Sequence, residues 1–315
     1  MSASLHELMR EACAAVAVEP PKRRLTPGVW TRTDSKGKNG KNDAAVFLDD
    51  NGNSGVAHNY QTGKSQRFSL EGLRQASNDN NPERDRERAR RDREEELQRQ
   101  EVERVCARIV SACREDRHAY FDKKGFPDEL GLVCDDPRPF FPDSRLGEAL
   151  ARSLPDAEGK PLLIIPGRIG SKLVTVQFIT VSGVKKNILK GQMGGSFHRI
   201  ATGRDTWVCE GIGTALTVRA ALRLLGANAT VLSAFSASNV GRVAESIAGS
   251  RIAADHDKPV EGLENQGAGE FYARRTGRRW VMPPEMGDFN DMHMAPGDRK
   301  ENLRAVALRL REVMG

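Results

Sequence analysis

The sequence is poor in the residues that cross-link small proteins or span membranes. Its 315 residues include five cysteines, and no two of them form a CxxC pair. This spacing excludes a zinc ribbon and a disulfide framework, and it fits a reducing compartment. No apolar run approaches the roughly 18 residues that a membrane-spanning helix needs, and no segment has the pattern of a signal peptide. We therefore expect a cytoplasmic protein with no membrane partner.

The phosphate-binding sequence GxxxxGK[S/T] is also absent from the chain. Because P-loop helicases depend on that sequence, any DNA unwinding must come from a separate protein. The length leaves room for two or three domains and a proper core. The formal net charge is +6 and the pI is about 9.1, which suits a polyanionic partner better than a membrane.

Strands and helices are expected to alternate in the C-terminal third of the chain. Short apolar runs predict strands at residues 206–209, 230–234, 251–254 and 280–282. Helical patterns separate these runs, and the first helix is expected to stop at Gly226. Such alternation predicts a parallel sheet with helices on both faces.

Carboxylates follow three of these strands, at Glu210, at Asp255 and Asp257, and at Asp288 and Asp291. Ligands of such sheets bind beyond the carboxyl ends of the strands, so an acidic crevice is expected there. Any one of these residues alone is more simply a cap or a turn residue. Their recurrence in strand order favours a shared cation site, and an oxygen-only ligand set favours Mg²⁺ or Mn²⁺ over zinc.

This arrangement resembles the Toprim domain. The resemblance rests on Glu210-Gly211 after a strand, on Asp255-x-Asp257 two strands later, and on the acidic cluster 288–291. Bacterial-type primases, type IA and type II topoisomerases and some nucleases share this domain. It implies a Rossmann-like parallel sheet over residues 206–295.

Upstream segments resemble primases in particular. Residues 161–166, 173–179, 185–191 and 194–198 are similar to the basic α+β subdomain that precedes Toprim in primases, expected here over residues 119–205. Residues 117–126 resemble a stretch of primase-like proteins from phages and plasmids. The similarity covers roughly residues 100 to 295. It implies a primase of a mobile element, similar to the catalytic core of bacterial-type DNA primases.

The remaining segments are predicted from their local patterns. Residues 1–75 are expected to form a helix and a small β-meander. Residues 76–118 are expected to form a polar linker and then one long charged helix reaching about His118. An amphipathic helix is expected within residues 296–315.

The resemblance implies a metal-dependent nucleotidyl transfer that makes short primers on single-stranded DNA from nucleoside triphosphates. Asp255 and Asp257 would hold one or two divalent cations, with help from Asp288 and Asp291. Glu210 would complete the metal site or act as the general base. Cellular primases have a second acidic residue four positions after this Glu, where the present chain has Thr214.

Basic residues of the preceding half are candidates for nucleotide and template phosphates: Lys124, Arg168, Lys185, Lys186, Lys190 and Arg199. Among them Lys186 and Lys190 match the primase pattern best. In the N-terminal meander, Lys64 and Arg67 accompany Trp30, Phe47, His58, Tyr60 and Phe68. Aromatic side chains that lie between basic ones can stack on the bases of single-stranded nucleic acid, while the basic side chains contact its phosphates. The alternative is a minimal β-core with buried aromatics and solvated lysines.

Three other functions agree less well with the sequence. A topoisomerase would need a nucleophilic tyrosine in a strand-passage domain, but the sequence has only three tyrosines, and its length leaves no room for the gate domains. A Toprim nuclease of the overcoming-lysogenization type would lack the basic subdomain. A non-catalytic DNA-binding or anti-defence factor would have no need of Glu210, Asp255, Asp257 and Asp288.

Overall fold

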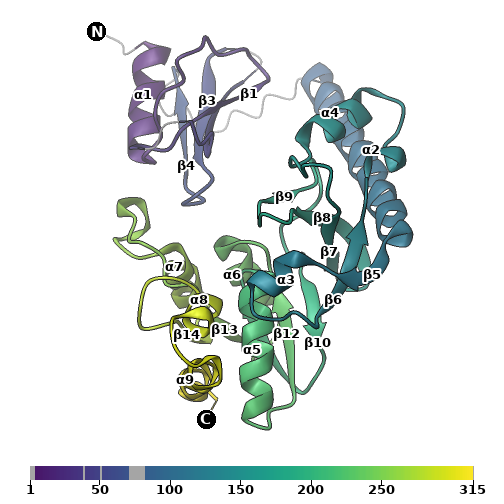
Figure 1. The fold of residues 1–315 in the computed structure, drawn as a ribbon. Coiled ribbons are helices and arrows are strands. Elements are labelled where there is room, and N and C mark those ends of the chain that lie inside the picture. Colours follow the sequence, from purple (N-terminus) through teal and green to yellow (C-terminus); the bar gives the residue numbers. More distant parts are fainter. Residues whose placement is uncertain (1–3, 38–39, 50–51, 71–81, 315) are drawn as a thin grey trace. The chain divides into compact units, whose positions relative to one another are not determined.

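The computed structural model describes residues 4–37, 40–49, 52–70 and 82–314, and the chain divides into two compact units. The first unit comprises the residues up to Asn81 together with Pro259–Ala268. The second comprises Pro82–Lys258 and Gly269–Gly315. The fold is mixed α/β, with two antiparallel sheets and a C-terminal sheet that is largely parallel (Figure 1). The polar linker expected from residue 76 lies outside the described residues up to residue 81.

The first unit is a four-stranded meander covered on one face by a helix. Strands β1 (Trp30–Thr33), β2 (Ala44–Leu48), β3 (Ser54–Asn59) and β4 (Ser65–Ser69) pair in chain order, and helix α1 (Leu5–Ala15) packs on β2, β3 and β4. Ser4 starts the helix, because its side chain accepts a hydrogen bond from the Glu7 amide and the Glu7 carboxylate accepts one from the Ser4 amide. The helix and meander expected from the sequence are both present.

The long helix of the second unit is shorter than expected. Helix α2 (Pro82–Ala112) ends before His118, because residues 114–117 form strand β5 (Arg114–Arg117) and pair antiparallel with β6 (Leu130–Cys134). The helical prediction for these residues was wrong. All four β5 side chains are exposed at a sheet edge, so backbone pairing rather than an apolar pattern specifies the strand.

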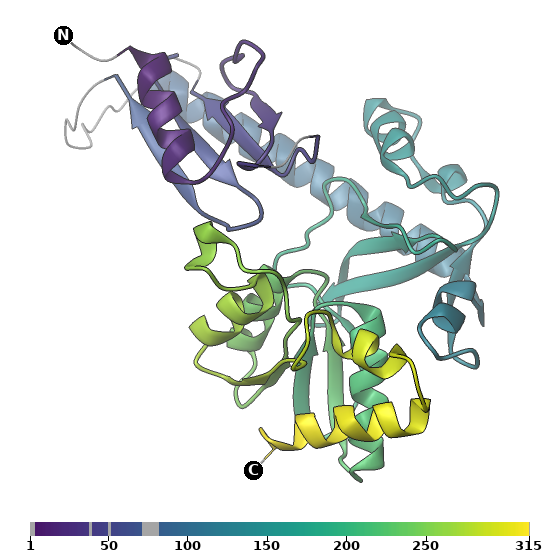
Figure 2. The same ribbon diagram turned by 60° about the vertical axis from the view of Figure 1, so that its left-hand side comes forward.

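The antiparallel sheet of this unit has the order β5-β6-β7-β8-β9. It includes β7 (Leu162–Ile169), β8 (Lys172–Ile179) and β9 (Lys185–Asn187). Helices α3 (Ala119–Lys123), η1 (Arg138–Phe140) and α4 (Arg145–Ser153) lie in its connections. On β7, Leu162 and Ile164 pack with the last turns of α2, whereas Leu163 and Ile165 pack with α3. Figure 2 shows α2 along one side of this sheet. Because β7 is buried on both faces, residues 162–165 are apolar without interruption.

The C-terminal sheet has the order β10-β12-β11-β13-β14. Strands β11 (Asp205–Cys209), β12 (Ala229–Ser233), β13 (Arg251–Ala253) and β14 (Arg279–Val281) are parallel, as predicted. Strand β10 (His198–Ala201) pairs antiparallel at the edge, although the sequence assigned it to the preceding basic half. Helix α5 (Ile212–Leu224) ends at Gly226, whose φ of +68° fits the expected stop.

Helices cover both faces of this sheet. Helix α5 packs with α9 (Arg299–Arg311) and α8 (Phe289–Met294) on one face, and α6 (Ala237–Ser246) and α7 (Ala268–Arg275) cover the other (Figure 1). The short helix η2 (Glu261–Leu263) precedes α7. From β11 the chain passes through α5 to β12 on one side, and then through α6 to β13 on the other side. The strand order therefore reverses at β11, where ligands of such sheets bind.

The two sheets of the second unit share a core. Leu163 and Ile165 of β7 pack with Ile212 and Leu216 of α5. The Arg219 guanidinium on α5 donates to both carboxylate oxygens of Glu129, which precedes β6, and both side chains are largely buried. These contacts hold the antiparallel sheet against the N-terminal half of α5.

Two expectations from composition agree with the fold. All five cysteines lie in the described ranges and are free thiols. No helix in the described part of the chain is long and apolar enough to cross a membrane.

Candidate functional site

Glu210 lies between the end of β11 and the start of α5. Its backbone carbonyl accepts hydrogen bonds from the Phe235 amide at 2.8 Å and from the Ser233 hydroxyl at 3.1 Å. Phe235 has a φ of +71°, a left-handed conformation that costs a bulky residue on the order of 1–3 kcal/mol. The neighbouring strand end therefore fixes the Glu210 backbone at the expense of local strain.

The segment from Asp255 to Asp257 follows β13, next to Glu210. The amide of His256 donates to the Gly287 carbonyl at 2.9 Å, and the Gly287 amide donates back at 3.0 Å. One carboxylate oxygen of Asp257 accepts from the Gly269 amide in the first turn of α7, at 2.8 Å. The His256 ring turns to the Pro283 carbonyl, 3.0 Å from Nδ1. The backbone of His256 and the carboxylate of Asp257 are thus each held by a neighbouring segment.

Asp288 and Asp291 begin helix α8 as a capping box. An Asp288 oxygen accepts from the Asp291 amide at 2.8 Å, and an Asp291 oxygen accepts from the Asp288 amide at 3.0 Å. Asp291 is exposed, whereas Asp288 is partly buried. Both aspartates expected in the metal site therefore also have a structural role.

Glu210 and Asp255 are electrostatically coupled to their acidic neighbours. Burial and the Asp257 carboxylate raise the pKa of Glu210 to about 7, with a smaller effect of Asp288. Burial and then Glu210, Asp288 and Asp257 raise the pKa of Asp255 well above its usual value. Lys185 lowers both pKa values but does not offset these effects. Four of the five predicted carboxylates therefore form one acidic cluster, which we define as Glu210, Asp255, Asp257 and Asp288.

Lys185 reaches this cluster from the antiparallel sheet. Its Nζ lies 3.4 Å from the position of a β-carbon on Gly211 and 5.7 Å from the Tyr120 ring centroid. On β9, Lys185 is opposite Ile179, which faces α3, whereas Lys186 is opposite Phe178, which faces α2. Side chains alternate along a strand, so only one of the two neighbouring lysines points to the carboxylates.

Lys190 lies on the α2 side and donates a hydrogen bond to the Gln98 side chain. The structure thus brings Lys185 to the acidic cluster, rather than Lys186 or Lys190, which the sequence pattern favoured.

Lys124 is the C-cap of α3, and its side chain lies beside the start of α5, with Cδ 3.1 Å from the position of a β-carbon on Gly213. Its carbonyl accepts a hydrogen bond from the buried Asn290 side chain at 2.8 Å, and the same amide group donates to the Thr217 hydroxyl at 3.0 Å. Sequence analysis missed this role of Asn290, although its position between the predicted ligands Asp288 and Asp291 was a signal.

The histidine at the start of α3 is structural. Nδ1 of His118 accepts from the Tyr120 amide at 3.2 Å, so Nε2 carries the proton and donates to the Pro161 carbonyl at 3.1 Å. Burial lowers the pKa of His118, which keeps this neutral tautomer at pH 7.

The other predicted basic residues belong to two separate regions of the chain. Arg168 and Arg199 line a cleft of about 490 Å³ together with His198 and Ser171, and no carboxylate lines this cleft. His198 is held by the Pro166 carbonyl, 3.0 Å from Nδ1. Lys64 and Arg67 belong to the first unit and are exposed.

The acidic cluster has the donor chemistry of a hard-cation site. Oxygen δ1 of Asp255 is buried and has no hydrogen-bond partner. A divalent cation would satisfy this atom and favour the charged form of its neighbours. Within the described ranges, no three Asp, Glu, His or Cys side chains converge closely enough to hold a metal ion as they are placed. The carboxylates would therefore have to turn towards a bound ion.

Comparison with known protein families gives no match to the chain.

The contact between Gly269 and Asp255 generates a testable prediction. A β-carbon on Gly269 would lie 2.2 Å from the Asp255 carbonyl oxygen, which is backbone and has little freedom to move. Gly269→Ala should therefore displace Asp255 and destabilise the protein by about 1–3 kcal/mol, the usual cost of overpacking. Chemical denaturation measures this loss.

The matched control is Gly241→Ala in helix α6, where the nearest atom would be 3.5 Å away. Alanine is the better helix former, so this variant should be neutral or slightly more stable. Equal stability of the two variants would contradict the close packing of α7 on Asp255.

Proposed function

We propose that the second unit is the catalytic core of a Toprim-type primase of the kind found in phages and plasmids. It would join nucleotides into short primers on single-stranded DNA. One observation carries the proposal. At the sheet's switch point, Glu210 and Asp255 follow adjacent parallel strands, and Lys185 from the basic sheet lies beside them. Phosphoryl transfer needs this combination of carboxylates for cations and a fixed positive charge for phosphate.

The acidic cluster would hold one or two Mg²⁺ or Mn²⁺ ions, while Asp291 completes the capping box of α8. Bound cations would neutralise charge on the transferring phosphate and orient its oxygens. Glu210 is the residue best suited to take the proton of an attacking 3′-hydroxyl. Without a cation, burial and Asp257 raise its pKa to about 7, and a cation bound in the cluster would lower that pKa and favour the carboxylate that a base needs.

Lys185 would contact the phosphates of the incoming nucleoside triphosphate. It is exposed on β9, and its Nζ is near the glycine that follows Glu210. Lys124, which borders the first turn of α5, would add a second positive charge. Because the acidic cluster repels a polyanionic substrate, phosphate would bind at this position only when cations occupy the cluster.

The basic cleft between β7 and β10 would take the template. Arg168 and Arg199 are both exposed there, and neither has a carboxylate beside it in the cleft lining. Contacts of this type neutralise backbone phosphates without reading sequence. Because the chain lacks a P-loop sequence, a separate helicase would provide the single strand.

The proposal predicts primer synthesis that depends on the acidic cluster. The assay uses single-stranded circular DNA, labelled nucleoside triphosphates and Mg²⁺ or Mn²⁺. The intact chain should make short labelled products, and Asp255→Ala should lose them because a cation ligand is gone. Glu285→Gln, an exposed charge change outside the cluster, is the control and should retain activity.

Two other outcomes would overturn the primase proposal. Cutting of the DNA that depends on a divalent cation and on Asp255, without synthesis, would indicate a nuclease. DNA binding with neither activity would indicate a non-catalytic DNA-binding factor.

A second prediction compares the two neighbouring lysines of β9. Lys185→Ala should reduce primer synthesis at least 10-fold, because one charge at the transferring phosphate is lost. Lys186→Ala removes the same charge from the opposite face of the strand and should cost much less. Steady-state rates at several nucleotide concentrations measure both effects. Equal losses would contradict the assignment of Lys185 to the nucleotide.

A further inference from the structure

The face of the N-terminal sheet away from α1 carries a row of aromatic side chains. Val46, Ala57 and Phe68 pack with α1, so the alternate residues of these strands point to the other face. In register across that face, Trp30 is opposite Phe47, Phe47 is opposite Val56, and Val56 is opposite Arg67. The next row runs from Arg32 through Ala45 to His58 and Ser65.

The rings on this face form a continuous series. The centroid of Trp30 lies 5.3 Å from that of Phe47 and 6.4 Å from that of His58, and His58 lies 4.6 Å from Tyr60. We call these four residues the aromatic face. Trp30 is 46% exposed and Tyr60 is 42% exposed, whereas Phe68 is 6% exposed in the core. The aromatic side chains of this meander are therefore not simply its core.

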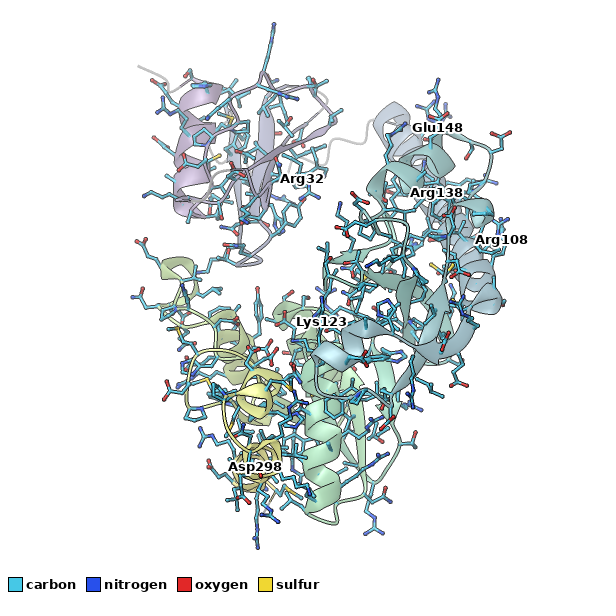
Figure 3. All side chains as sticks on the ribbon, in the orientation of Figure 1. Arg32, Arg108, Lys123, Arg138, Glu148 and Asp298 are labelled. Atoms are coloured by element: carbon cyan, nitrogen blue, oxygen red, sulfur yellow. The ribbon has the colours of Figure 1, made fainter. Side chains whose placement is uncertain are left out.

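Positive charge borders the aromatic face. The Arg32 guanidinium lies 4.3 Å from the Tyr60 ring centroid, and Arg32 is labelled on this unit in Figure 3. The groove beside Trp30 and Arg32 is also lined by three consecutive basic residues, Lys22, Arg23 and Arg24. Glu19 and Asp34 line the same groove, but the Asp34 carboxylate accepts hydrogen bonds from the amides of Gly40 and Asn42.

His58 provides a neutral ring in the middle of this series. Its Nδ1 is 2.7 Å from the Ser65 hydroxyl. Burial, and then the charge of Arg32, lowers its pKa. The histidine is therefore uncharged at pH 7, and its ring supports the two outer aromatics by edge-on contacts.

We propose that the aromatic face binds single-stranded DNA. Bases would stack on Trp30 and Tyr60, and Arg32 with the basic stretch from Lys22 to Arg24 would contact the backbone phosphates. Stacking on exposed rings beside basic side chains is sequence-tolerant, and it requires bases that are free of a duplex. The proposal rests on the exposure and charge of the first unit and does not depend on the catalytic proposal for the second.

The test measures binding of fluorescein-labelled oligothymidylate to the full chain by anisotropy at fixed salt. Trp30→Ala and Tyr60→Ala should each weaken binding about 5-fold or more, since one stacked base is lost. Arg32→Ala should weaken binding and lower its salt dependence, because one phosphate contact is lost. Arg10→Ala removes an exposed charge on α1, away from the aromatic face, and should have a much smaller effect.

A second readout separates stacking from a loss of folding. The chain has three tryptophans, and Trp207 is buried. Oligothymidylate should quench the fluorescence of Trp30, and the Trp30→Phe variant should lose this quenching. Its affinity for oligothymidylate should stay within about 3-fold of that of the unmodified protein, because a ring remains on which a base can stack. Unchanged affinity and quenching in Trp30→Ala would overturn the proposal, and so would equal affinity for duplex DNA. Asp255→Ala should bind normally, which separates this result from a failure of catalysis.

Discussion

The crowding of carboxylates around Glu210 and Asp255 is the constraint on which the C-terminal half depends. Burial and mutual repulsion raise the pKa of both groups, so each favours its protonated form more in the fold than in solution. A group of this kind stabilises the fold below its unfolded pKa, and that contribution is lost as the pH rises through the raised value. Near pH 7 the cluster therefore weakens the protein unless a cation compensates, which is a cost typical of functional sites.

The surrounding fold maintains this arrangement at several points. The strained Phe235 and the Ser233 hydroxyl hold the Glu210 backbone, and the capping box of α8 holds Asp288. Asn290 links α8 to the Lys124 carbonyl, so the α3 segment is fixed to the same group of helix ends. The antiparallel sheet adds Lys185 from its edge strand. Two sheets with different topologies thus contribute opposite charges to one place.

Sequence patterns predicted the parts of the fold that are buried on both sides. The runs at 206–209 and 251–254 are apolar after their first residue, and both form parallel strands. Strands β5 and β10 were missed because edge strands gain stability from backbone pairing that side chains do not signal. The register of β9 with β8 decides whether Lys185 or Lys186 points to the acidic cluster. A shift of this register by one residue would exchange the faces of the two lysines, and the sequence does not specify the register.

The most direct test of the account is a calorimetric titration of the protein with Mn²⁺ in buffers of different ionisation enthalpy. A cation site built from carboxylates with raised pKa values should release protons when it binds the ion, and its affinity should increase from pH 6 to pH 8. Asp255→Asn should remove both the binding and the proton release. Binding that involves no protons, or binding that Asp255→Asn leaves unchanged, would contradict the assignment of the acidic cluster as a cation site.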